Sequence, residues 1–490
     1  MTLRAGEGSV MQENFVLDRG LATQAVNLAL DMGAEYAEAR MESFVSNGLF
    51  LKNGNPEIAG FGTFSGMCVR VLMHGGMGFA STDILKKNNI RDRVETAVRM
   101  AKASSRLVKD RIILSDEPTH VADYSVEQKK KLSDVGLDDI VSVLAHIDKS
   151  MTESAPMVNR FISLGMEERT KFFANSDDSK IASVIPRIDI FTIPTIKEGE
   201  KMSQASIHRG VSMGWEYMDP DKRAQEICHE IAMTHKNMKE GVKAPAGKID
   251  MVLGPEVVGI AAHESCGHPY EADRISGREA AQAGESFVNA SMMGSRIGSS
   301  VATVVDDPTL PNSYGFYLYD DEGVKARPKI LIKNGMINEF LHNRETSAAM
   351  DMGQSNGGAR ADNYDREAIV RMSNTFVAPG DRSDEELFED IKLGVYMKSF
   401  KEWNIDDKRY NQRYIGREAY LIENGEVKAP VKAPILELTT PAFWTAIDAV
   451  GKDLEFSAAT CGKGEPSQGI PVYIGGPHIR LKGITLGVGK

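Results

Sequence analysis

The spacing of apolar residues in the first half of the chain predicts both helices and strands. Apolar positions three and four residues apart predict helices over about 16–31, 90–103 and 138–151. Alternating apolar and polar positions predict strands over 36–41, over 48–52 and repeatedly between 158 and 217. The last of these stretches is typical of antiparallel sheet, so this half combines helices with a sheet.

The middle of the chain contains a change of domain. Asp219 and Pro220 open a further helix, because proline is tolerated at the first helical position. The stretch 241–247, rich in Lys, Ala, Pro and Gly, is the predicted boundary. A strand is expected directly after it, from Lys248 to Leu253, and a break and a helix beginning at Pro255 follow.

The rest of the chain has mostly strand patterns. Asn334-Gly335 and Asn424-Gly425 indicate turns between strands. Helices are expected over 277–293, over 384–403 with Ser383 as the N-cap, and over 441–450. These patterns predict an α+β protein of two domains: a mixed α/β N-terminal region over 1–240 and a strand-rich C-terminal domain over 241–490. A subdivision of the first domain near 110–125 is left open.

Composition limits the compartment and the partners. The chain has 490 residues and a formal net charge of −11, which argues against broad phosphate binding and hence against nucleic acid as a partner. No apolar run approaches the about 20 residues that span a bilayer, and the start lacks a basic segment followed by an apolar one. Four scattered cysteines do not suggest disulfides. We expect a cytoplasmic protein with reduced thiols and no membrane contact.

His263, Glu264 and His268 form the pattern His-Glu-x-x-x-His near the middle of the chain. Two imidazoles can hold a metal ion, and the carboxylate between them can act on a metal-bound water. Residues five apart lie about 140° apart around an ideal helix, so the two rings would not point at one ion. Gly267 permits an unwound or bulged last turn, and Pro269 ends the helix there. This context favours a catalytic metal site over two histidines that are neighbours by chance.

A catalytic zinc ion takes three protein ligands and keeps one position open, so a further ligand is needed. Cys266 follows His263 in the same strained turn and is the weaker candidate. Cys461 is better placed, because the glycines near it let the backbone approach a site closely and a thiolate binds zinc strongly. Spacing alone does not decide, because a lone cysteine is commonly a small buried hydrophobe. A second set, His229-Glu230 with His235, has a spacing of six in an uninterrupted helix and is interpreted as packing or surface.

Over nearly its whole length the sequence resembles the TldD/PmbA family of zinc metallopeptidases, in the branch that keeps the metal motif. The resemblance is carried by His263-Glu264-Ser265-Cys266-Gly267-His268 with Glu271-Ala272-Asp273, Val304-Val305-Asp306-Asp307-Pro308, Asp320-Asp321-Glu322-Gly323, Leu341-His342-Asn343-Arg344-Glu345, Ser355-Asn356-Gly357-Gly358-Ala359-Arg360, Arg371-Met372-Ser373-Asn374-Thr375 and Thr460-Cys461-Gly462-Lys463.

The resemblance implies roles for four residues. The metal ligands would be His263, His268 and Cys461, and Glu264 would be the catalytic base. The metal would be one Zn²⁺ per chain, with iron as the other candidate. The implied activity is proteolysis of unstructured or extended peptides inside a closed shell of subunits. The implied partner is a TldE/PmbA-like homologous subunit in a heterodimer, with a homodimer as the alternative.

Other residues keep more than one interpretation. Glu271 and Asp273 could orient a ligand histidine through hydrogen bonds, Glu271 could replace Cys461 as a ligand, or both could be solvated carboxylates after a helix end. His342 is a candidate for stabilising the tetrahedral oxyanion.

Substrate binding has the weakest signal in the sequence. A sheet edge could hold an extended peptide through its backbone, and a glycine-rich segment could allow the close approach that this requires, unless it is only a turn. The candidate residues in that segment are Asn356, Gly357, Gly358 and Arg360.

Two other functions stay open. One is a non-catalytic peptide-binding or scaffold subunit of the same fold, which would be expected to lack His263, Glu264 or His268. The other is a hydrolase of small amides or formyl groups, because peptide deformylases use a similar pair of histidines with a cysteine.

Overall fold

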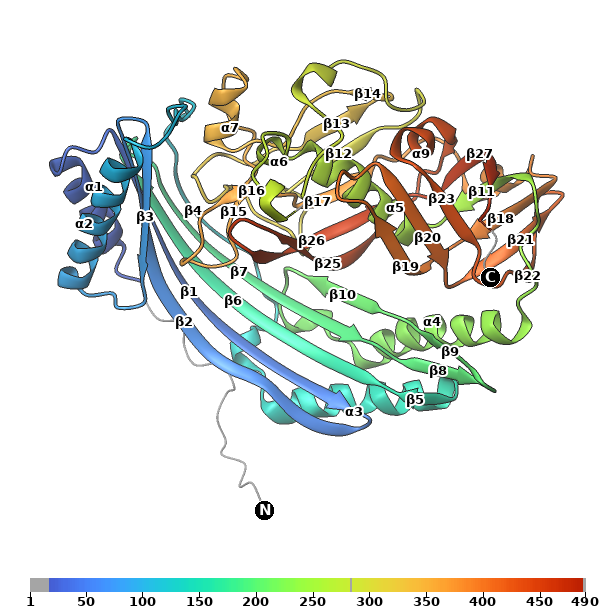
Figure 1. Ribbon diagram of the computed structural model, residues 1–490. Helices are drawn as coiled ribbons and strands as arrows, with labels where there is room; N and C mark the ends of the chain where they lie inside the picture. Colours follow the sequence, from blue (N-terminus) through green and yellow to red (C-terminus); the bar gives the residue numbers. More distant parts are fainter. Residues whose placement is uncertain (1–16, 283, 488–490) are drawn as a thin grey trace.

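A computed structural model of the protein describes residues 17–282 and 284–487. Long curved strands from the first half of the chain pass beneath the second half, and helices cover the ends of these strands (Figure 1). The α+β class predicted from the sequence is confirmed. The division at about residue 241 stays a prediction.

The large curved sheet has the strand order β10-β7-β6-β1-β2-β3, and β4 pairs with β7. Its strands are β1 (Tyr36–Lys52), β2 (Asn55–Met73), β3 (Gly76–Thr82), β4 (Val121–Ser125), β6 (Phe161–Asn175), β7 (Lys180–Thr192) and β10 (Ile207–Val211). A small sheet beside it contains β5 (Met157–Asn159), β8 (Thr195–Glu198) and β9 (Lys201–Gln204). The antiparallel strands predicted between 158 and 217 are confirmed, whereas the two predicted around 36–52 form one continuous strand.

Strand β1 shows how the two faces of this sheet differ. Successive side chains of a strand point to opposite faces. Odd-numbered apolar residues between Ala37 and Leu51 enter two cores that contain the helices α1 (Arg19–Asp31), α2 (Lys87–Ser104), α3 (Leu137–Ser154) and α4 (Pro220–Glu240). Even-numbered Glu38, Arg40 and Glu42 are also buried, on the other face. One face is therefore apolar and covered by helices, and the other is charged.

The charged face contacts the second half of the chain through hydrogen bonds and ion pairs. Arg70 on β2 binds Glu322 with an N–O distance of 2.6 Å, and Lys171 on β6 binds Asp321 at 2.8 Å. Arg40 donates to the backbone carbonyl of Asn363. Because buried charges need partners, these contacts define how the sheet lies against the second half.

Two further sheets and one helix build the second half. The first has the order β22-β21-β18-β11-β27-β24, with β11 (Lys248–Leu253), β18 (Leu393–Met397), β21 (Ala419–Glu423), β22 (Glu426–Pro430), β24 (Ile447–Val450) and β27 (Ile479–Thr485). The second has the order β14-β13-β12-β17-β26-β25, with β12 (Val304–Asp306), β13 (Lys329–Lys333), β14 (Met336–Ile337), β17 (Asn374–Val377), β25 (Glu455–Lys463) and β26 (Gln468–Gly476). Helix α5 (Pro255–Ala262) follows β11 and belongs to the same large apolar core as both sheets.

Smaller elements complete this half. They are the sheet β19 (Phe400–Ile405), β20 (Asn411–Gly416) and β23 (Ile435–Thr439), the pair β15 (Ala359–Arg360) and β16 (Ile369–Val370), and the short helices α6 (Ala272–Ile275), α7 (Arg344–Ala349), α8 (Asp384–Phe388) and α9 (Thr440–Ala446).

Three predicted helices are wrong in extent. The stretch 277–293 forms only two short 3₁₀ turns, Ala280–Gln282 and Ala290–Met292. Ser383 caps a helix as predicted, but α8 ends at Phe388, and from Leu393 the chain pairs as β18 with β11 and β21. The helix expected over 441–450 is α9, and its last residues instead form β24 against β27. Strand pairing decides in both cases, since tertiary contacts override helix propensity.

Within the described residues, no helix is both long and apolar enough to cross a membrane. The first residues of the chain, on which the expectation about a leader segment depends, lie outside the described part.

Asp306, at the end of β12, connects three segments of the second half. It accepts hydrogen bonds from Ser373 and Thr375, and its carboxylate lies 3.2 Å from the ammonium of Lys329. Neither charged side chain is exposed. We expect Asp306→Ala to lower the free energy of unfolding by about 3–5 kcal/mol, because it leaves a buried cation without its partner. Urea unfolding followed by fluorescence measures this.

The double variant Asp306→Ala/Lys329→Met is the matched control. It removes both charges, so it should recover a large part of the loss. A single variant as stable as the wild type would contradict the structural role given to Asp306.

Candidate metal centre

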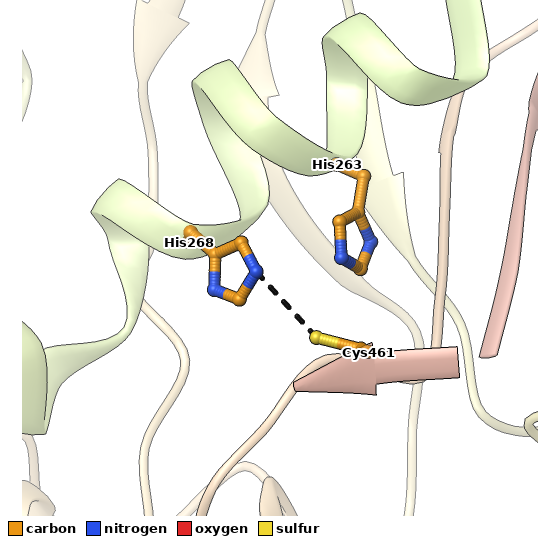
Figure 2. Close-up of side chains that lie close together, drawn as sticks. All are labelled: His263, His268 and Cys461. Carbon is orange, nitrogen blue, oxygen red and sulfur yellow. Dashed lines mark hydrogen bonds between the residues drawn. The ribbon is translucent and has the colours of Figure 1, made fainter. Parts of the chain in front are cut away.

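The helix that carries the two histidines changes its pitch at them. The regular helix α5 ends at Ala262, and His263–Gly267 form a π-helical turn in which the N–H of His268 donates to the carbonyl of His263. A π-turn joins residues five apart. The widened last turn predicted from the sequence is therefore confirmed, and both rings lie on one side of the helix (Figure 2).

Gly267 makes this turn possible. A Cβ atom at this position would lie 1.9 Å from the sulfur of Met372, which is itself fully buried. Such a distance is far below a van der Waals contact, and the dense core around Met372 leaves little room for it to move.

Cys461, on the edge strand β25, faces the two histidines. Its Sγ lies 3.5 Å from Nε2 of His268, and the two imidazole rings are 4.9 Å apart and nearly perpendicular (Figure 2). One possible ligand atom from each of the three residues lies within 4.8 Å of the others, and all three residues are buried. The structure thus brings together residues that are 193 positions apart in the sequence.

The three side chains have the chemistry of a metal site. Two imidazoles and a thiolate match the nitrogen and sulfur ligands that zinc prefers. Nδ1 of His263 is buried without a hydrogen-bond partner among the described residues, which is costly unless another group binds there. Burial lowers the pKa of His263 and of His268, so both rings favour the neutral form that can bind a metal.

The thiol of Cys461 is biased toward the thiolate. Burial alone would raise its pKa, but the charges of a protonated His268 and of Arg371 outweigh burial and the pKa lies below its ordinary value. Arg371 keeps this effect when His268 is neutral. Arg371 is fully buried and also donates to the backbone carbonyl of Cys461, so it both supports the charge and fixes the strand.

Glu271 lies on the far side of His268 from the cysteine. Nδ1 of His268 donates to its carboxylate at 3.0 Å, which leaves Nε2 facing Cys461. Lys463 Nζ lies 3.3 Å from Glu271 and 2.6 Å from Asp273. This hydrogen-bonding arrangement orients the imidazole, one of the interpretations that the sequence left open for Glu271.

The three residues open into a cavity of about 990 Å³. Glu264 also lines this cavity, and Arg409 binds its carboxylate from a turn between β19 and β20. The opposite wall comes from the large sheet and includes Asp189, Phe191 and His208. The arrangement places a buried carboxylate and a possible metal site on one side of a cavity that a ligand can enter.

Other residues singled out in the sequence lie elsewhere. Asn356 and Gly358 pack around the backbone of His342, whereas Gly357 lies against the backbone of Lys325 and Ala326. Arg360 lines a second, neighbouring cavity of about 270 Å³. The ring of His342 is buried against Thr346, and burial lowers its pKa to about 4. None of these residues is among those that line the larger cavity within the described part of the chain.

The alternative ligands also lie apart from the cluster. Cys266 points into the apolar core, and burial raises its pKa well above the ordinary value. His229 is exposed and Glu230 pairs with Arg209 and Arg417, while His235 pairs with Glu198. These three therefore do not converge, as the spacing of six indicated.

Comparison with known proteins places the chain in a family. Three models match it: the PmbA/TldA metallopeptidase domain 1 over 37–101, the central domain over 130–234 and the C-terminal domain over 246–488. A metalloprotease of Methanocaldococcus jannaschii is 32% identical over 464 residues, which cover 94% of this chain and 98% of that protein. The chain belongs to the PmbA/TldD family. The resemblance stated from the sequence is confirmed.

Two further relatives extend the comparison of this PmbA/TldD protein. A zinc metalloprotease TldD homolog of Saccharolobus solfataricus is 27% identical, and the match covers 94% of this chain and 98% of that one. The crystal structure of TldE from Thermococcus kodakarensis has a TM-score of 0.74 at 16% identity, covering 96% of this chain and 100% of that chain. The structural match shows that the fold is shared.

Sequence reasoning gave no role to three residues of this PmbA/TldD site. Lys463 lies two positions after Cys461, on the same side of a strand, so recognition of β25 could have found it. Arg371 belongs to one of the segments that carry the family resemblance, but the sequence alone indicated no role for it. Arg409 is 145 positions from Glu264, and no local pattern indicates their contact.

Replacing Gly267 should disrupt the site. We expect Gly267→Ala to lose most bound metal and to lower the melting temperature, because the added methyl group collides with Met372. Gly462→Ala is the matched control beside another ligand, since a Cβ there meets nothing within 4 Å. Metal analysis and thermal unfolding of both variants test this, and equal metal content in Gly267→Ala and wild type would contradict it.

The two cysteines should differ in their effect on metal content. Protein purified without added metal should contain about one ion per chain in the wild type and in Cys266→Ala, and much less in Cys461→Ala. Mass spectrometry of the metals in the three preparations measures this. If Cys461→Ala keeps its ion, another residue must be the third ligand.

Proposed function

We propose that this protein is a zinc-dependent peptidase that hydrolyses extended peptides, with Glu264 as the general base. The observation that supports this most directly is the buried cluster of His263, His268 and Cys461 beside the carboxylate of Glu264, on the wall of one cavity. The PmbA/TldD family, whose models are described as metallopeptidase domains, supports the same reaction class.

His263, His268 and Cys461 would hold the ion. Zinc is proposed over iron because of the nitrogen and sulfur ligands and because one relative is named a zinc metalloprotease. A bound zinc ion supplies a Lewis acid that lowers the pKa of a water molecule and polarises the carbonyl of the scissile peptide bond.

Glu264 would move the protons. One carboxylate oxygen binds Arg409, so the pair fixes the carboxylate at the cavity wall. The carboxylate takes a proton from the attacking water and later delivers it to the leaving amine. A thiolate ligand makes the metal a weaker Lewis acid than a third imidazole would, so the reaction depends more strongly on this base.

The substrate would bind along β25. Among the described strands β25 pairs with β26 alone, so its other edge forms no strand pairing, and Ser457 to Gly462 line the cavity. An extended peptide can add to such an edge through backbone hydrogen bonds. These bonds recognise the backbone of the peptide more than its side chains. We propose this edge, in place of the segment from Asn356 to Arg360, as the peptide-binding site.

We also propose that this chain works together with a second subunit. The fold shared with TldE over nearly the full chain supports pairing with a TldE/PmbA-like homologous protein, or with a second copy of this chain.

Glu264→Ala should abolish peptidase turnover while the metal stays bound, because the base is lost and the three ligands are kept. Glu437→Ala, an exposed carboxylate on β23, should retain wild-type turnover as the control. Assays with unstructured peptides, together with metal analysis, test both. Full activity of Glu264→Ala would overturn the mechanism, and cleavage of a formylated dipeptide without cleavage of longer peptides would favour the small-amide hydrolase.

A further inference from the structure

Arg409 is the ion-pair partner of Glu264. Its guanidinium binds the carboxylate directly, and the side chains of Glu264 and Arg409 are 7% and 19% exposed. A charge this deeply buried needs a partner of opposite sign, and Arg409 supplies it. Both residues line the cavity that contains the histidines and the cysteine.

The turn that carries Arg409 is rigidly held. Arg409 has a left-handed backbone conformation with φ of 62°, which is unfavourable for a side chain of this type. The carboxylate of Asp406 accepts the N–H groups of Tyr410 and Asn411 across the turn. Thr440 donates to the carbonyl of Arg409 at 2.7 Å. Unfavourable backbone that is fixed from two sides is typical of functional positions.

The guanidinium of Arg409 has hydrogen-bond donors that do not bind Glu264. One Nη binds Glu264, while Nε is buried without a hydrogen-bond partner in the described part of the chain. An arginine offers five N–H donors in a planar fork, so Arg409 can bind Glu264 and a second oxygen at once.

We propose that Arg409 stabilises the oxyanion of the tetrahedral adduct during peptide hydrolysis. This inference rests on the proposed function, because it assigns a catalytic residue to the same reaction. The pair with Glu264 is then the state of Arg409 before the reaction begins.

The movement of negative charge during the reaction explains why one cation can serve both Glu264 and the oxyanion. Glu264 takes a proton from water as the water oxygen bonds to the carbonyl carbon, and the electron pair of the C=O bond moves to the carbonyl oxygen. The negative charge leaves Glu264 and appears on the oxyanion. When the C–N bond breaks, the C=O bond forms again and Glu264 gives its proton to the amine. Arg409 lies where it can neutralise the charge in each state, which preferentially stabilises the transition state.

His342, the residue considered for this role from the sequence, does not line the cavity within the described residues, whereas Arg409 does. Arg409 also matches the charge that must be balanced, since burial favours the neutral form of His342 by lowering its pKa to about 4.

The first test uses the full-length protein loaded with zinc and a peptide substrate. Arg409→Gln should lower kcat by about 10²–10³-fold with little change in KM, and Arg409→Lys should recover part of the loss. Lys408→Gln is the matched control in the same turn, since Lys408 is largely exposed and pairs with Glu285. All variants should keep the metal content of the wild type. Loss of metal in Arg409→Gln, or unchanged kcat, would overturn the inference.

The second test separates oxyanion binding from an effect on Glu264 alone. In a phosphinic peptide, a tetrahedral PO₂⁻ group replaces the scissile amide and mimics the adduct without reacting. Calorimetry should show that Arg409→Gln weakens its binding by about the same factor as kcat/KM falls, while Lys408→Gln does not. If turnover falls but the affinity for the phosphinic peptide is unchanged, Arg409 acts only through Glu264 and the inference fails.

The proposed function and this inference can fail separately. Wild-type protein that cleaves no peptide would contradict the proposed function. The binding of the phosphinic peptide would then still test whether Arg409 holds the oxyanion. Equal affinity of wild type and Arg409→Gln for this peptide would overturn that role. So would a lack of binding to either protein.

Discussion

The candidate metal centre depends on one widened helical turn. Because His263 and His268 are five residues apart, a regular helix would point their rings about 140° apart. The π-turn places them together, and it persists because Met372 fills the space that a side chain at position 267 would need. The strand β11 and Pro255 fix the start of the helix, and after the π-turn the chain continues through a 3₁₀ turn, His268–Tyr270, that contains Pro269. Local sequence and tertiary packing therefore act on the same few residues, and neither alone would align the two imidazoles.

Buried charges hold the surroundings of this turn in place. Lys463 is fully buried and pairs with Glu271 and Asp273, and Arg371 supports Cys461 from the other side. Buried ion pairs add little net stability, because desolvation offsets most of the attraction. Their value here is geometric: each charge accepts only a partner of opposite sign at a short distance, so the orientation of His268 and of the cysteine strand is tightly defined. The same holds for the charged face of the large sheet, where Arg70 and Lys171 determine how that sheet meets the second half.

The sequence predicted what short-range patterns control. The strand Lys248–Leu253, the helix from Pro255 and the bulge before His268 follow from alternation, proline and glycine within a few residues. The predictions that failed concern regions controlled by distant partners: Leu393–Met397, predicted as helix, form β18 because β11 and β21 lie beside them. The site divides in the same way. His263, Glu264 and His268 are visible as a motif, and Cys461 was singled out for its glycines and its thiolate chemistry. Arg409 and its contact with Glu264 exist only in three dimensions, since nothing in the turn 406–411 indicates which carboxylate it meets.

The shape of the cavity adds a constraint that the chemistry alone does not supply. One wall is the edge of β25 that pairs with no described strand, and the opposite wall is the large curved sheet, which contributes Asp189, Phe191 and His208. A chain that pairs with β25 must be extended, because only an extended backbone presents its N–H and C=O groups to a strand edge. Under the proposed function, selection for unfolded peptides therefore follows from backbone pairing with β25 and needs no recognition of particular side chains. The ion pairs of Arg70 with Glu322 and of Lys171 with Asp321 hold the large sheet, and with it this opposite wall, against the second half of the chain.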